Sequence, residues 1–403
     1  MNPIYDVCII GGGVAGAFCL YKIAKEYGSN CKVALFEASR PPGKRRPQMQ
    51  GWLGCYPSSD GKLYLNDIQK ITNIAGLRKT KTALNYFKKV MNNVDLFPTT
   101  KDKGPSISLS KKIKKAGFST SLNDYIQTYP KNVHALSKFI ANTVEIPSIN
   151  CFFDTEVSQV FKQKDEFVII ADNEEFRCKK LIISVGRSGW YWARNLYKNF
   201  GIIDNNDTSR FGIRVEMNSL FLKDFNKSCC TLNKDGLEIG PFNWDGTVIP
   251  EDHVEMVITS FRANENRWLT DKVSFNIIGN RYFENNGFEQ MDRIGKLIFI
   301  LSNDRVVKEK VSNIISNKSR ISILPEFNWM SDCLNQISGF IPDIISKAYF
   351  YIPTIIPSAP KINISKTFES EIENMFILGE SAGVSGLLSA ALMGIMGADF
   401  ACK

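Results

Sequence analysis

Residues 4–37 read IYDVCIIGGGVAGAFCLYKIAKEYGSNCKVALFE and carry the main signal for the fold of this chain. The run at 4–10 is short and apolar, as in a strand that is buried on both faces. Gly11, Gly13 and Gly16 then form the pattern G-x-G-x-x-G, and helical spacing of apolar residues begins directly after it. A tight turn, a close approach to a pyrophosphate and close helix packing each require one of these glycines. The stretch therefore predicts a dinucleotide site.

The next strand supplies the acid that such a site needs. KVALFE at 32–37 predicts a second parallel strand that ends in Glu37, 21 positions after Gly16. A carboxylate there is placed to accept hydrogen bonds from the ribose hydroxyls of an adenosine. The N-terminal end of the intervening helix provides partial positive charge for the phosphates. Strand, turn, helix, strand and acid thus follow the order of the motif.

Composition and length limit the class of protein. The 403 residues predict two or three domains, and 44% hydrophobic with 23% charged residues is ordinary for a globular protein. Two histidines, His134 and His253, are too few for a His-rich metal site, so we predict no metal. Ten cysteines without a C-x-x-C pattern indicate reduced thiols of an intracellular protein, and we expect a cytoplasmic location.

The C-terminal end repeats the pattern of strand, glycine, acid and helix. NMFIL at 374–378 predicts a buried strand that runs into GESAG at 379–383 and then into an apolar helix. Small side chains recur at every fourth position of this last segment, which predicts close packing against a neighbour, the first dinucleotide-binding helix. These positions are Gly386, Ala390, Gly394 and Ala398. Glu380 and the many small residues make the segment a poor membrane span.

A third piece lies midway along the chain. Residues 153–189 predict short strands joined by hairpin turns, and the last apolar run ends in Ser184-Val185-Gly186. Together the three pieces resemble FAD enzymes of the glutathione-reductase type. In that family the acid of the closing motif, here Glu380, holds a ribityl hydroxyl of the flavin, and the strand near Val157 presents backbone to the adenine. The resemblance implies FAD as the cofactor.

Further motifs narrow the resemblance. The chain is similar to uncharacterised FAD-dependent dehydrogenases of this superfamily, relatives of the BaiN/HI-type flavoproteins. It shares SDGKL at 59–63, GRSG at 186–189 and a GVRVE-like GIRVE at 212–216. It departs from the family in GESAG for GDGAG, and in lacking the arginine of the family's S-R-G-I after that motif. The family offers a fold and a cofactor without a settled reaction.

The predicted fold is α/β, a Rossmann-like FAD-binding domain of the glutathione-reductase type with an inserted mixed α+β substrate domain. We assign residues 1–74, 146–203 and 361–403 to the first domain and 75–145 and 204–360 to the second. Within the insert, we expect helices from the segments at 84–94, 122–129, 133–144 and 291–316, and a polar, lysine-rich connection at 99–115. That connection is either a solvated surface or a contact for an anionic partner.

The predicted site combines the motifs with their neighbours. Lys44 or Arg45 is placed to stabilise an anionic flavin or a substrate carboxylate, with FAD phosphate binding or plain exposure as alternatives. A flavin-facing aromatic among residues 190–192 competes with core packing, and His253 is a weaker candidate base. The catalytic candidates are Arg45, Cys55 and Lys62. The predicted cofactor-binding residues are Gly11, Gly13, Val14, Ala15, Gly16, Glu37, Ala38, Arg40, Lys44, Arg45, Val157, Ser184, Gly186, Gly379, Glu380, Gly386, Leu387 and Leu388.

Three functions fit these features. The first is an FAD-dependent dehydrogenase or reductase that acts on a small molecule bound between the two domains. The second is an FAD-dependent monooxygenase, and the third is a flavoprotein that modifies RNA or protein, for which the net charge of +9 permits a nucleic-acid contact. No second G-x-G-x-x-G appears in the sequence, so NAD(P)H would have to bind transiently if it is the electron donor.

Overall fold

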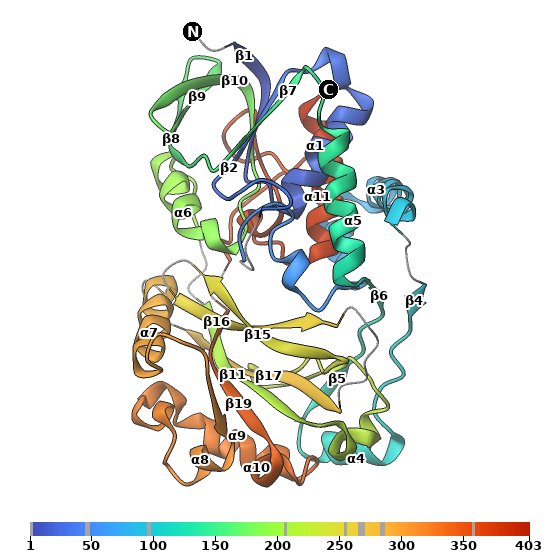
Figure 1. Cartoon of the computed structure of the whole chain (residues 1–403), viewed down its shortest axis with the longest axis vertical. Coiled ribbons are helices and arrows are strands. Elements are labelled where there is room, and N and C mark those ends of the chain that lie inside the picture. Colours follow the sequence, from blue (N-terminus) through green and yellow to red (C-terminus); the bar gives the residue numbers. More distant parts are fainter. Residues whose placement is uncertain are drawn as a thin grey trace.

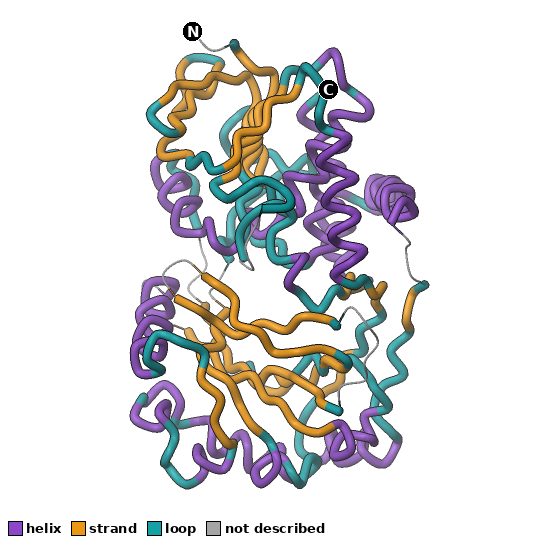
Figure 2. Tube along the Cα trace, viewed as in Figure 1, coloured by secondary structure: helices purple, strands orange, loops and turns teal. Residues whose placement is uncertain are grey.

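The structure is a computed structural model that describes residues 3–44, 49–94, 98–204, 208–253, 256–264, 271–282, 287–356 and 359–403. The chain forms two bodies stacked along its long axis, and both ends of the chain lie on the same body (Figure 1). Each body has a hydrophobic core of its own. Helices flank the sheet of the upper body, whereas strands dominate the middle of the lower one (Figure 2). This is the predicted α/β fold with a second, mixed domain.

The sheet of the first body has the order β7-β2-β1-β10-β9-β8, with β20 also paired to β10. Strands β7, β2, β1, β10 and β20 run parallel, and β9 and β8 are antiparallel additions. The predicted strands at both ends of the chain and the hairpins midway are confirmed. The bounds are β1 Ile4–Ile10, β2 Val33–Glu37, β7 Ile149–Phe153, β8 Val157–Gln163, β9 Glu166–Ala171, β10 Glu174–Ile183 and β20 Met375–Ile377.

Helices cover this sheet, and the packing of the first on the last is close. A Cβ on Gly394 of α11 would overlap the carbonyl oxygen of Ala15 in α1 and lie 3.1 Å from the Cys19 nitrogen. The small-residue stripe therefore has the predicted role of bringing both ends of the chain together. The helices of this body are α1 Val14–Glu26, α2 Asp67–Ala75, α3 Leu77–Met91, α5 Pro130–Thr143, α6 Trp190–Asn199 and α11 Leu387–Ala401.

The second body is built on an antiparallel sheet of order β18-β19-β11-β17-β13-β12-β5, with β14 paired to β17. A separate hairpin, β15 and β16, completes this body, whereas a small sheet of order β3-β6-β4 packs on the first core through Leu63 and Ile126. Their bounds are β3 Lys62–Tyr64, β4 Thr99–Thr100, β5 Ser119–Ser121, β6 Tyr125–Gln127, β11 Thr208–Asn218, β12 Thr231–Lys234, β13 Leu237–Ile239, β14 Asn243–Trp244, β15 Gly246–His253, β16 Met256–Ala263, β17 Lys272–Tyr282, β18 Val307–Lys310 and β19 Tyr349–Ile356. The helices are α4 Ile107–Lys115, α7 Gly287–Leu301, α8 Ser312–Ile315, α9 Trp329–Ser338 and α10 Ile344–Lys347.

Packing divides residues 75–145 differently from the expected assignment to the insert. Helices α3 and α5 belong to the first core, because their apolar stripes face α11 and α1. The Phe87 ring lies 5.5 Å from Phe18, and Phe139 lies 5.6 Å from Tyr21, between ring centroids. Amphipathic spacing predicts that a helix is covered but does not say which core covers it.

Three local predictions in the insert were wrong. Residues 125–127 are strand β6 instead of helix, because β3 and β4 offer them backbone partners on both sides. Residues 307–310 form strand β18 beside β19 for the same reason. The lysine-rich connection contains helix α4, whose Leu109 and Ile113 are buried in the second core. Non-local strand pairing overrides local helical spacing in the first two cases.

Across the part of the chain that the structure describes, no helix has the length and apolarity needed to cross a bilayer.

Candidate functional site: a dinucleotide cavity between both ends of the chain

The turn after β1 has the backbone that the motif predicts. Gly11 adopts a φ of +99°, and a Cβ there would lie 2.9 Å from the carbonyl oxygen of Ser184. A Cβ on Gly16 would overlap the Gly11 carbonyl, so this glycine lets helix α1 approach the turn. Helix α1 has no acidic residue in its first turn and no side-chain cap. Its N-terminal N–H groups are thus free of a competing carboxylate and can face an anionic group.

Glu37 ends β2 beside this turn and is buried. Its Oε2 accepts a hydrogen bond from the Gly12 nitrogen (2.8 Å), and its Oε1 accepts one from the Ser39 nitrogen (2.9 Å). Each carboxylate oxygen has two acceptor sites, so the side chain can hold the loop and also accept from a ribose hydroxyl. The acid therefore orients the glycine turn in addition to its predicted role.

The turn after β10 is tied to the same loop. The Ser184 hydroxyl donates to the carbonyls of Gly11 (2.8 Å) and Ile10 (3.1 Å), and its backbone nitrogen donates to Ile10 (2.9 Å). The predicted S-V-G turn thus lies directly against G-x-G-x-x-G. A short helical turn, Arg187–Gly189, continues from it toward the closing motif.

The closing motif meets that turn through an ion pair. Nη2 of Arg187 lies 3.2 Å from Oε1 of Glu380, and both side chains are partly buried. Burial by itself would lower the pKa of Arg187, but Glu380 outweighs it and the pKa is raised. The Arg187 guanidinium also lies over the Trp190 ring at 5.6 Å. Glu380 therefore lies at the junction of the middle and C-terminal motifs.

A cavity of about 480 Å³ joins these parts. It begins at the glycine turn and Glu37, passes between the S-V-G turn and the closing motif, and ends at the segment 49–64. This last segment reaches the second body, because the nitrogen of Met49 donates to Asp252 (3.3 Å) and the nitrogen of Ala263 donates to Ser59 (3.2 Å). A second hollow of about 710 Å³ between β8 and α6 shares Trp192 with the cavity but has none of the glycine motifs in its lining.

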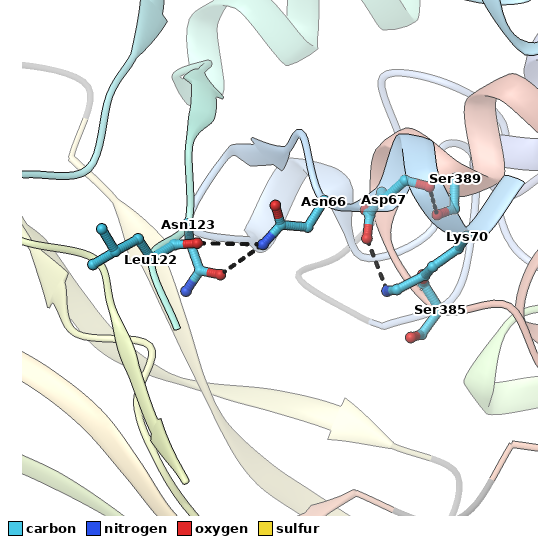
Figure 3. A network of polar contacts seen from close by, with 7 residues as sticks. All are labelled: Asn66, Asp67, Lys70, Leu122, Asn123, Ser385 and Ser389. Carbon is cyan, nitrogen blue, oxygen red and sulfur yellow. Dashed lines mark hydrogen bonds and ion pairs between the residues drawn. The ribbon is translucent and has the colours of Figure 1, made fainter. Parts of the chain in front are cut away.

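A polar network connects the start of α2 to the start of α11 (Figure 3). Lys70 donates to Oδ1 of Asp67 (2.8 Å) and to the carbonyl of Ser385 (3.1 Å). A Cβ on Gly386 would overlap the Asp67 carboxylate, and the φ of Gly386 is +117°. Burial raises the pKa of Asp67 against the opposing effects of Lys70 and a Ser389 backbone N–H. Gly386 is thus required both by its φ and by this carboxylate.

The far end of the cavity has a polar wall. The Lys62 ammonium donates to Oδ1 of Asn243 on β14 (2.6 Å) and lies 5.3 Å from the centre of the Tyr125 ring. Asp60 accepts from the Lys62 backbone nitrogen (3.1 Å) and from the Tyr64 hydroxyl (3.2 Å). Burial lowers the pKa of Lys62, but Cys229, Asp60 and Tyr125 outweigh it and raise the pKa overall. Lys62 therefore stays protonated at neutral pH.

Most of the predicted cofactor residues lie around the cavity. The predicted residues that line it are Gly11, Gly13, Val14, Ala15, Glu37, Ala38, Val157, Ser184, Gly186, Gly379, Glu380, Gly386 and Leu387, together with the catalytic candidates Cys55 and Lys62.

Other predicted residues lie elsewhere. Gly16 serves helix packing, and Leu388 is buried in the first core. Arg40 and Lys44 are exposed and do not line the cavity. Arg45 and the side chain of His253 lie outside the described residues. Among the aromatics at 190–192, Trp192 lines the cavity, whereas Trp190 is buried in the protein.

Sequence reasoning missed several lining residues. The main ones are Met49, Tyr64, Arg187 and Ser385, whereas Asp60 lies in the stretch 52–62 that we expect near the flavin ring. One signal could have found Arg187, because it is part of GRSG. The pairing of Arg187 with Glu380 joins positions 193 residues apart, which no local pattern indicates.

These features define a flavoprotein with a Rossmann-like FAD-binding fold, and FAD is its cofactor. The profile of the family described as "Glucose inhibited division protein A" matches residues 6–236, more than half of the chain. The chain therefore belongs to that family. A sequence comparison with curated proteins finds no match.

Solved structures that align with this chain over most of its length include glycine oxidase from Geobacillus kaustophilus (13% identity, 99% of this chain and 95% of that chain covered, TM-score 0.47). A flavoprotein/dehydrogenase from Cytophaga hutchinsonii has 14% identity, with 99% and 78% covered and a TM-score of 0.45. The p-nitrophenol 4-monooxygenase PnpA from Pseudomonas putida DLL-E4 has 10% identity, with 99% and 78% covered and a TM-score of 0.43.

The cavity fits FAD on its own geometry. An uncapped helix start meets a turn whose glycines leave no room for side chains, which suits a diphosphate. Glu37 lies at the edge where a ribose would be held, and Glu380 lies at the other end beside Gly386. The glycine turn, Glu37, the S-V-G turn and the start of α11 would hold the cofactor.

Proposed function

We propose that this protein is an FAD-dependent oxidoreductase of the dehydrogenase or reductase type, acting on a small molecule in the cavity between its two bodies. One observation carries the proposal: a single cavity runs from the dinucleotide turn, past the closing motif, to the polar wall at 59–64. FAD, when bound, supplies hydride transfer. The chain supplies a cavity in which a substrate can contact the flavin ring, and side chains that exclude water from that cavity.

Individual residues have distinct parts in this proposal. Gly11, Gly13 and Glu37 bind the adenosine diphosphate end, and Glu380, held by Arg187, binds toward the ring. The segment 49–64 lines this end of the cavity and is hydrogen-bonded to the hairpin β15–β16 of the second body. Lys62, Tyr64 and Cys55 line the part of the cavity next to these segments and are the side chains placed to contact a substrate.

The first test is whether the purified protein carries flavin. We expect a yellow protein that releases FAD, identified by mass, on acid denaturation. Under anaerobic conditions NADH, NADPH or a reduced substrate should bleach the absorbance near 450 nm, and an electron acceptor should restore it. A colourless protein that takes up no FAD would contradict the proposal.

Two alternatives predict other outcomes. A monooxygenase would incorporate one atom of labelled O₂ into its product, whereas a dehydrogenase or reductase would not. A flavoprotein that modifies RNA would bind tRNA with an affinity that falls steeply as salt rises. The exposed lysines of α4 favour testing this second alternative, although α4 lies at the end of the second body that is turned away from the first body (Figure 1). We further propose that the chain groups with the BaiN/HI-type branch, on its SDGKL, GRSG and GIRVE motifs.

A further inference from the structure

The polar wall contains two buried cations that form no ion pair. Lys62 is 6% exposed and Arg214 is 8% exposed. Lys62 lines the cavity, and its contacts are the neutral Asn243 amide, the Cys229 thiol and the Tyr125 ring. Nε and Nη1 of Arg214 have no hydrogen-bond partner. Neither side chain forms an ion pair within the described ranges of the chain.

Strand β11 directs Arg214 toward this wall. Phe211, Ile213 and Val215 alternate with Arg214 and lie in the second core, so the guanidinium extends from the opposite face of the sheet. Arg214 does not itself line the cavity. Its neighbour Asn276 on β17 lies two residues from Ser274, which pairs with Asn243, the residue that accepts from Lys62. Asn276, directly opposite Arg214 on β17, also has a buried Oδ1 without a partner.

Two carboxylates lie near the cations without forming an ion pair with either. Asp60 accepts from the Lys62 backbone nitrogen and the Tyr64 hydroxyl, and its charge raises the pKa of both Lys62 and Arg214. Glu251, the second acid near Arg214, also raises the pKa of the guanidinium. Burial lowers the pKa of Arg214 to about 10, so the side chain is still charged at neutral pH. Buried N–H groups without an acceptor are costly, and Nε and Nη1 of Arg214 are such groups, which is a reason to look for a ligand that accepts hydrogen bonds.

We propose that Lys62 and Arg214 form the binding site for the carboxylate of a small, monoanionic substrate. This inference rests on the proposed function, since it names the substrate class for the same cavity. A monoanion fits better than a dianion because Asp60 and Glu251 remain close by and would repel a second negative charge. The guanidinium offers a planar pair of N–H groups, the geometry that a carboxylate matches.

The test uses FAD-loaded protein and isothermal titration calorimetry with benzoate, with its neutral isostere benzamide and with inorganic phosphate. We expect benzoate to bind at least about tenfold more tightly than either, as expected for hydrogen bonds to charged groups. Lys62→Met and Arg214→Met should each weaken benzoate about tenfold or more and leave benzamide binding and FAD content unchanged. Lys111→Met removes an exposed charge on α4 and serves as the control, with unchanged affinity for both probes.

Stability separates a binding role from a structural one. If Lys62 serves a ligand, benzoate should raise the melting temperature of the wild type and leave that of Lys62→Met unchanged. This variant keeps the test valid if Arg214→Met fails to fold. Equal affinity for benzoate and benzamide, tighter binding of phosphate, or unchanged benzoate affinity in Lys62→Met would overturn the proposal. A colourless protein that still binds benzoate through Lys62 would refute the proposed function and leave the anion site standing.

Discussion

The contact between α1 and α11 gives a sharp prediction, because one added methyl group should weaken both the fold and the FAD site. In Gly394→Ala the new Cβ would overlap the carbonyl oxygen of Ala15 and lie 3.0 Å from its carbon and 3.1 Å from the Cys19 nitrogen. These are backbone atoms, so the helices must separate by about 1 Å to restore ordinary contact distances. Overpacking of this kind costs about 1–3 kcal/mol, while alanine returns up to about 1 kcal/mol in helix propensity. We therefore expect a net destabilisation of about 1–2 kcal/mol.

A matched control lies one turn further along α11. In Gly397→Ala the nearest atoms are Cδ1 and Cδ2 of Leu378, at 2.8 and 3.0 Å, and this flexible side-chain end can move aside. Helix propensity then makes Gly397→Ala neutral or slightly stabilising. Because Ala15 also lines the cavity, Gly394→Ala should in addition lose FAD affinity. The temperature at which FAD is released, monitored by its fluorescence, measures the effect on the FAD site. The midpoint of urea unfolding measures the effect on the stability of the fold. If the two variants release FAD at the same temperature and unfold at the same urea concentration, the close helix contact is not as described.

Three further changes probe other parts of the molecule. Gly13→Glu should abolish FAD retention by placing a carboxylate in the cavity. The flavin-to-protein absorbance ratio measures this, and a yellow Gly13→Glu protein would refute the site. Burial raises the pKa of Asp67 above its ordinary 3.8, so the protein loses stability as the pH rises and this carboxyl ionises. Asp67→Asn should therefore melt at a higher temperature than the wild type near neutral pH and at the same temperature below pH 3.8. Equal melting temperatures at all pH values would count against this. Diamide oxidation should link Cys31 to Cys402, whose sulfurs lie 3.6 Å apart, and non-reducing peptide mass mapping that finds both free thiols would disprove it.

Much of the first body follows from local sequence. The strands at 4–10 and 33–37, the glycine turn and Glu37 lie within a stretch short enough that residue spacing fixes their geometry. The stripe of small residues in α11 likewise indicated a close helix contact, since only small side chains let two backbones approach. The family match and the cavity agree with this interpretation.

Tertiary structure decided what the patterns left open. Helices α3 and α5 have the apolar stripe expected of any covered helix, and only the available surfaces of α11 and α1 assign them to the first core. Residues 125–127 become a strand because β3 and β4 lie on either side. The polar wall joins Lys62 to Asn243, 181 positions apart, and brings Arg214 near Asp60. Such contacts depend on how two separate cores meet, and the spacing of residues along one segment contains no information about that meeting.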